Sequence, residues 1–145
     1  MKKLILLCTV VFIFISCSMD DGRRVDFTLE FIPVTNVTVP EYFERGQTYD
    51  ITVTYKRPTD CHYFDGFYYD REGNPSGNVW VVAAQAIVLS NVSCGSLSLI
   101  EGEQASFQFI CDPQYAHNEC VFKFFEGEDE DGNQRFREVV VPVAE

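Results

Sequence analysis

The stretch Q-T-Y-D-I-T-V-T-Y-K, Gln47 to Lys56, decides the fold class of this chain. Large apolar side chains occupy every second position, at Tyr49, Ile51, Val53 and Tyr55, and mostly polar residues stand between them. Successive side chains of a β-strand point to opposite faces, so this period of two predicts a strand with one buried face.

Similar segments recur along the chain and are separated by turn-forming residues. The eleven residues from Val79 to Leu89 are mostly apolar on both faces, but their β-branched side chains and the turn-rich Arg71–Asn78 before them favour a strand over a buried helix. No segment has a helical period. We therefore expect an all-β fold, an antiparallel β-sandwich of about seven to eight strands, with a closed barrel as the alternative. The other expected strands are Val25–Phe31, Val37–Val39, His62–Tyr69, Ala105–Cys111, Cys120–Phe125 and Gln134–Val143.

Two parts of the chain resemble bacterial immunoglobulin-like domains. Phe43–Tyr55 is similar to their second strand, which follows a glycine turn, and Val121–Val143 is similar to their last hairpin. Together they cover about a third of the chain that follows the N-terminal segment. The lone Trp80 does not lie between a cysteine pair as in antibody domains. The resemblance implies an immunoglobulin-like sandwich over residues 25–145.

The N-terminus has the order of an export signal. Lys2 and Lys3 precede an uncharged, mostly apolar run that ends at Ser16, and Cys17 follows. This run is shorter than the roughly 20 apolar residues that a membrane-spanning helix needs. We therefore expect residues 1–16 to be a signal peptide that is removed.

Ile15, Ser16 and Cys17 resemble the lipobox of bacterial lipoproteins, although Phe14 stands where leucine is usual. The resemblance implies that Cys17 carries lipid, and several acyl chains on it would form a stable membrane anchor. Residues 17–24 would then be a lipidated linker. Its acidic Ser18–Asp21 is similar to the leaders of surface-exposed lipoproteins of Bacteroidota-type bacteria, whose small uncharacterised lipoproteins the whole chain resembles. These likenesses imply an outer-membrane, lipid-anchored protein at the cell surface.

Composition limits the partners of the exported chain. Removal of residues 1–16 leaves 129 residues, enough for one domain with a real core. It also removes Lys2 and Lys3, so nine basic residues remain against 22 acidic ones and the net charge is −13. Such a charge argues against nucleic acid and anionic lipid headgroups as direct partners.

Four cysteines remain in the exported chain beyond the one expected to carry lipid. An even number in an exported protein predicts two disulfides. We expect Cys111 to pair with Cys120 across a hairpin and Cys61 with Cys94, with the crossed pairings open. Zinc is the rival interpretation, but the chain has no C-x-x-C motif and the compartment is oxidising. The sequence therefore predicts no metal site at these residues.

The run Glu126–Asp131 is the densest acidic segment. Asp129, Asp131, Gly132 and Glu138 fall at calcium-loop offsets, but Gly127 stands at position one and the flanking segments are strand-like. We therefore expect a β-hairpin that turns at Asp131-Gly132-Asn133.

The segment His62–Asp70 is the best candidate for ligand binding, because its aromatic faces are flanked by acids. Alternate aromatic residues of a strand usually face the core, so only part of this set can be exposed. A glycan or a surface protein is the expected ligand. The candidate binding residues are Tyr63, Phe64, Phe67, Tyr68 and Tyr69.

Motifs of catalysis are absent from the sequence: there is no G-x-S-x-G, no H-E-x-x-H and no phosphate-binding glycine loop. We therefore expect a non-enzymatic binding or structural module at the cell envelope, with no cofactor. Two alternatives stay open: a small glycan-acting hydrolase, and an adhesin domain steadied by calcium.

Overall fold

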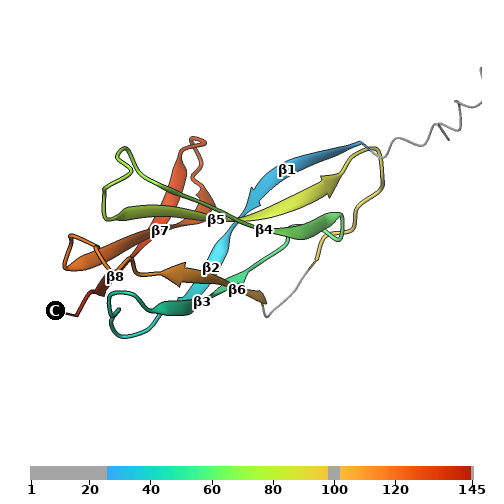
Figure 1. The fold of residues 1–145 in the computed structure, drawn as a ribbon. Helices are drawn as coiled ribbons and strands as arrows, with labels where there is room; N and C mark the ends of the chain where they lie inside the picture. The colour runs from blue at the N-terminus through green and yellow to red at the C-terminus, as the bar shows by residue number, and fades with distance from the viewer. Residues whose placement is uncertain (1–25, 98–101, 145) are drawn as a thin grey trace, which may run out of the picture.

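A computed structural model describes residues 26–97 and 102–144, which form a sandwich of β-strands (Figure 1). The all-β prediction is confirmed, and each expected strand is present. Within these ranges there is no helix that is long and apolar enough to cross a membrane. The expected signal peptide and the whole expected linker, residues 17–24 with Cys17, lie outside the described residues. The strands are β1 (Phe27–Ile32), β2 (Val34–Thr38), β3 (Thr48–Tyr55), β4 (His62–Arg71), β5 (Val79–Leu89), β6 (Glu103–Ile110), β7 (Glu119–Glu128) and β8 (Gln134–Pro142).

One layer of the sandwich is a three-stranded sheet in the order β2-β3-β6, with both pairings antiparallel. Its central strand β3 contains the stretch that predicted the fold. Ile51, Val53 and Tyr55 are buried, as the period of two predicts for one face of a half-buried strand. Thr52 lies on the opposite face, where its hydroxyl is 2.9 Å from that of Ser106 in β6.

The second layer is a five-stranded sheet organised around β5. β4 pairs with almost the whole of β5, so β1 and β7 must share the other edge. β7 pairs in parallel with residues 79–82 of β5, and β1 pairs antiparallel with residues 84–89. The parallel β5–β7 pairing departs from the two antiparallel sheets of an immunoglobulin domain, so the immunoglobulin-like assignment is not confirmed.

β1 and β2 belong to different sheets, and the chain crosses between the layers at Pro33 (Figure 1). Ile32 and Val34 on either side of this proline are buried between the sheets. Proline cannot donate a ladder hydrogen bond, so it suits the point where one strand ends and another begins. Phe27, Leu29 and Phe31 alternate with polar residues, and because Ile32 is out of phase with them they point away from the core.

The core between the two sheets is rich in aromatic side chains. Phe43 lies at its centre, with its ring 4.8 Å from that of Phe109 and 6.1 Å from that of Phe122. All three are fully buried, and such aromatic contacts add to the free energy of burial. The fully buried set also includes Ile32, Ile51, Val53, Val82, Phe124 and Val141.

The structure confirms one of the two expected disulfides. Cys61 and Cys94 are bonded, and the bond joins the start of β4 to the loop that follows β5. The expected Cys111–Cys120 disulfide is wrong, because both residues are free thiols. The prediction assumed a hairpin, but β6 and β7 lie in different sheets, so the cysteines beside them do not face each other across one ladder.

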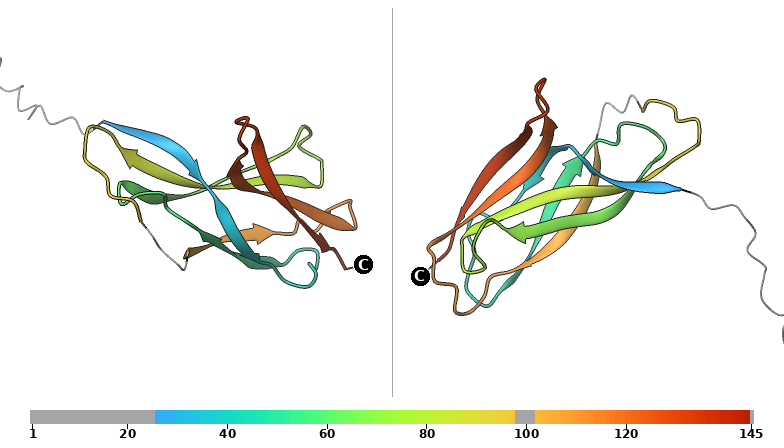
Figure 2. Two further views of the ribbon diagram at one scale, coloured as in Figure 1. Left: turned by 180° about the vertical axis from the view of Figure 1, so that it is seen from behind. Right: turned by 90° about the horizontal axis from the view of Figure 1, so that it is seen from above.

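The acidic run spans the end of β7 and the turn of the expected β7–β8 hairpin, which projects from one side of the sandwich (Figure 2). The carboxylate of Asp129 closes this turn by accepting the backbone N–H groups of Asp131 and Asn133, at 3.0 and 2.8 Å. These hydrogen bonds, chiefly those from Asn133, hold the pKa of Asp129 below its ordinary value. The Asp129 carboxylate therefore has a structural role in closing this turn.

Candidate functional site: a hollow on the outer face of the five-stranded sheet

A β-bulge in β4 divides the candidate binding residues between the two faces of the sheet. The register with β5 shifts between Phe64 and Gly66, so Asp65 is the extra residue. Phe64 and Phe67 consequently point inward and pack against the core. Tyr63 and Tyr68 point outward, with exposed fractions of 51% and 42%.

The fifth candidate, Tyr69, lies on the inner side of β4 at the edge of the sheet. Its ring stacks on that of Trp80, with the centroids 5.1 Å apart, and it stays partly exposed. The guanidinium of Arg71 lies over the Trp80 ring, 4.3 Å from its centre. The predicted aromatic segment therefore supplies both core and surface, and only Tyr63 and Tyr68 reach the outer face.

Tyr68 helps to line a hollow of about 440 Å³ on the outer face. The hollow lies where β1 and β7, which share one edge of β5, part from each other. Ala83 of β5 forms part of its floor, and its small side chain leaves space that a larger residue would fill. The remaining lining residues are Phe31, Asp70, Arg71, Glu72, Val81, Phe125, Gln134 and Phe136.

Four aromatic rings from four different strands follow one another around this hollow. The ring of Phe31 is 5.4 Å from that of Tyr68 and 5.9 Å from that of Phe125. Phe125 in turn lies 6.1 Å from Phe136, its partner across the β7–β8 ladder. Adjacent planes are tilted by 41° to 66°, so the rings form walls rather than one flat platform. Phe31 and Tyr68 are both 42% exposed, whereas Phe125, which contacts Phe31, is only 6% exposed.

The charged groups at the rim of the hollow are largely paired. Lys123 Nζ lies 2.6 Å from Glu72 Oε2 and 3.9 Å from the carboxylate of Glu138. Glu72 accounts for most of the rise in the pKa of Lys123, because its carboxylate favours the protonated amine. Arg71 is held over Trp80 and donates to the carbonyl of Pro75. Asp70 makes no ion pair with any residue that the structure describes, and its carboxylate accepts the backbone N–H of Arg71.

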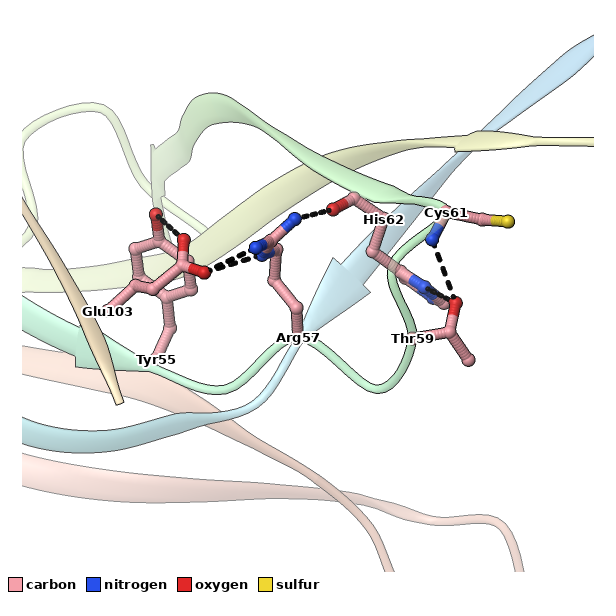
Figure 3. Close-up of polar contacts among 6 residues, drawn as sticks. All are labelled: Tyr55, Arg57, Thr59, Cys61, His62 and Glu103. Carbon is pink, nitrogen blue, oxygen red and sulfur yellow. Dashed lines mark hydrogen bonds and ion pairs between the residues drawn. The ribbon is translucent and has the colours of Figure 1, made fainter. Parts of the chain in front are cut away.

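A second cluster of polar residues lies at the end of the sandwich where β4 begins (Figure 3). Thr59 Oγ1 is 2.8 Å from His62 Nδ1, and His62 Nε2 is 3.6 Å from Glu30 Oε2. A hydroxyl, an imidazole and a carboxylate in this order are the groups of nucleophilic catalysis. Here the hydroxyl also accepts the backbone N–H of Cys61, and His62 is buried. The contacts therefore order the turn that carries the disulfide.

Arg57 fastens the same end of the two sheets together (Figure 3). Its Nε and Nη2 atoms lie 2.7 and 2.5 Å from Glu103 Oε1 at the start of β6, and its Nη1 donates to the carbonyl of His62. Tyr55 contacts the same Glu103 carboxylate. The pKa of Tyr55 is raised, chiefly by burial and to a lesser extent by the charge of Glu103. The cluster is a structural clamp between the sheets.

Metal-ligand side chains converge at one place in residues 26–97 and 102–144, where Asp60, Cys61 and Cys94 lie together. The two sulfurs are bonded to each other, so neither is a thiolate that could bind zinc. The carboxylate of Asp60 accepts the backbone N–H of Gly95 at 2.8 Å. This group therefore closes the loop around the disulfide.

The sequence pointed to Tyr68 but not to most of the residues that surround it. Phe31, Phe125 and Phe136 come from strands whose neighbours in the sheet cannot be read from a period of two. The parting of β1 and β7 on one edge of β5 is likewise a property of topology. The sequence shows an aromatic residue in each of these strands, but it does not show which strands are neighbours in the sheet.

Comparison with known proteins identifies no relative of this chain. No protein-family model, curated protein or solved structure matches the chain.

Proposed function

We propose that the protein is a non-enzymatic binding module that lipid on Cys17 holds at the outer membrane. Its ligand contacts the outer face of the five-stranded sheet, at the hollow lined by Phe31 and Tyr68. The single observation that carries this proposal is the exposure of large aromatic side chains around a concave site on that face.

Exposed aromatic rings support a binding role because burial of such rings normally stabilises the fold. Phe31 and Tyr68 remain 42% exposed although the same sheet buries Phe67 on its other face. Truncating either ring should therefore cost the fold little. A ligand that covers them would gain free energy from the same apolar surface.

The polar clusters support a binding module over a hydrolase. The groups that could serve as nucleophile and base, Thr59 and His62, hold a turn and do not line the hollow. The hollow combines apolar walls with a few polar groups, which is the composition of a ligand site.

The anchor is tested by membrane fractionation of the full chain expressed in a bacterium with an outer membrane. Cys17→Ser should move the protein from the membrane fraction to the soluble fraction, because the thiol that accepts lipid is gone. Cys8→Ser is the matched control, since it removes a cysteine within the signal and should leave the protein in membranes. A Cys17→Ser protein that stays in membranes as strongly as wild type would overturn the anchor.

The independence of the binding face from the anchor is tested with the double variant Phe31→Ala/Tyr68→Ala. This protein should stay folded and membrane-bound, because neither ring belongs to the core or to the anchor. Loss of membrane location by this variant would contradict the division between an anchor and a binding face.

A further inference from the structure

We propose that the hollow over Ala83 holds a neutral sugar ring of a glycan. This inference rests on the proposed function and adds the chemical class of the ligand. The volume of about 440 Å³ lies within the range of small-molecule sites, roughly 300–1,000 Å³.

The walls of the hollow fit the apolar faces of a sugar ring. A pyranose presents C–H groups on its two faces and hydroxyl groups around its edge. Phe31 and Tyr68 expose ring surface to the hollow from two sides of β5, and the buried Phe125 packs against Phe31. Such surfaces pack on C–H faces by dispersion and by burial of apolar area.

The rim of the hollow fits the hydroxyl groups of the same ring. The carboxylate of Asp70 accepts hydrogen bonds, and the side-chain amide of Gln134 both donates and accepts them. A hydrogen bond to a carboxylate is stronger than one between neutral groups, so Asp70 would fix the orientation of a hydroxyl.

The charge balance at the rim favours a neutral ligand over an ionic one. Glu72 is paired with Lys123, and Arg71 is engaged by Trp80 and the Pro75 carbonyl. Neither cation is therefore available to neutralise a carboxylate or sulfate of the ligand. The net charge of the chain, −11 over its full length, repels acidic glycans further. A lone Asp70 is also a weak site for a cation, since exposed ion pairs contribute little.

A substitution at Ala83, on the floor of the hollow, tests the site most directly. Ala83 is 2% exposed and lies opposite Tyr68 in the β4–β5 ladder, so its side chain points to the same outer face. Ala83→Leu adds side-chain volume where the sugar ring would lie. Tyr63 is the matched control, because it lies on the same strand and face as Tyr68 and is exposed, but does not line the hollow.

The test uses the full mature lipoprotein in zwitterionic detergent on a printed array of neutral and acidic oligosaccharides, with trimethylammonium compounds as further probes. Affinity for each retained sugar is then measured by isothermal titration calorimetry. We expect neutral oligosaccharides to bind. Tyr68→Ala should weaken binding by roughly threefold to tenfold, Ala83→Leu should weaken it further, and Tyr63→Ala should leave it unchanged.

Three results would overturn the inference: no neutral oligosaccharide binds, acidic or trimethylammonium probes bind more tightly, or Tyr63→Ala weakens binding as much as Tyr68→Ala. If Ala83→Leu unfolds, the comparison of Tyr68→Ala with Tyr63→Ala decides alone. Failure here is distinct from failure of the anchor. A protein that leaves the membrane on Cys17→Ser but binds no sugar refutes the sugar site and leaves the lipid-anchored module standing.

Discussion

The rings of Phe31 and Tyr68 lie 5.4 Å apart, although β1 and β4 are bonded to opposite edges of β5. The two side chains meet over the strand between them, where Ala83 occupies the outer face. A small residue at this point allows two rings from non-neighbouring strands to meet and leaves a hollow beside them. The binding site that we propose depends on this relationship.

The bulge at Asp65 predicts opposite consequences for two adjacent aromatic residues. Phe67→Ala should lower the free energy of unfolding by about 3 kcal/mol, because its partly buried ring packs against the core. Tyr68→Ala should lower it by less than about 1 kcal/mol, because the outer face already exposes that ring. Guanidinium unfolding of both variants measures the difference. Equal losses would mean that the bulge does not divide the residues in this way.

The cysteine pairing predicts a pattern of alkylation. Iodoacetamide added to denatured, unreduced protein should modify Cys111 and Cys120, because they are free thiols. Cys61 and Cys94 should become reactive only after reduction. In the folded protein all four should resist the reagent, since the two thiols are buried. Peptide mass spectrometry locates each adduct. A Cys111–Cys120 disulfide instead of adducts on these two residues would contradict the structure.

The Cys61–Cys94 disulfide should contribute substantially to stability. The two residues are 33 positions apart, and closing such a loop in the unfolded chain contributes about 4 kcal/mol on the chain-entropy model. The free energy of unfolding of the double variant Cys61→Ser/Cys94→Ser should therefore be lower by that amount, as measured by denaturant unfolding. Reduced wild-type protein is the control and should show a similar loss. Unchanged stability in both would exclude a stabilising role for the bond.

The buried thiol of Cys120 predicts that stability falls at alkaline pH. Burial raises its pKa from 9.0 to about 11, so the folded protein keeps this proton at pH values where the unfolded chain releases it. The stabilisation is complete below about pH 9 and is lost as the pH rises towards 11, by on the order of 2 kcal/mol. Unfolding in guanidinium at several pH values measures this loss. Cys120→Ala should show a shallower decline, and an equal decline would assign it to other groups.

The sequence was sufficient to predict the strands because most of them carry their own period of two. Val79–Leu89 is mostly apolar on both faces, yet its β-branched residues and the turn before it predicted a strand correctly. In Gln47–Lys56 the buried face was also readable, since only one face is apolar. These features are local, so the chain itself contains the information.

The features that the sequence did not predict depend on how strands are arranged. The hairpin assumed between Cys111 and Cys120 failed because β6 and β7 lie in different sheets. The exposed face of β1 could not be foreseen, because an alternating strand has two faces and its pattern does not say which neighbour covers each. The register shift at Asp65 likewise could not be predicted from the spacing of the aromatic residues in His62–Tyr69.

The central claim is that lipid on Cys17 holds this sandwich at the membrane and so presents its outer face to a ligand. The most direct measurement is the intact mass of the protein extracted from bacterial membranes, with fragmentation of its N-terminal peptide. We predict a chain that begins at Cys17 and carries acyl chains on that residue. An unacylated chain, or one that retains residues 1–16, would contradict the account.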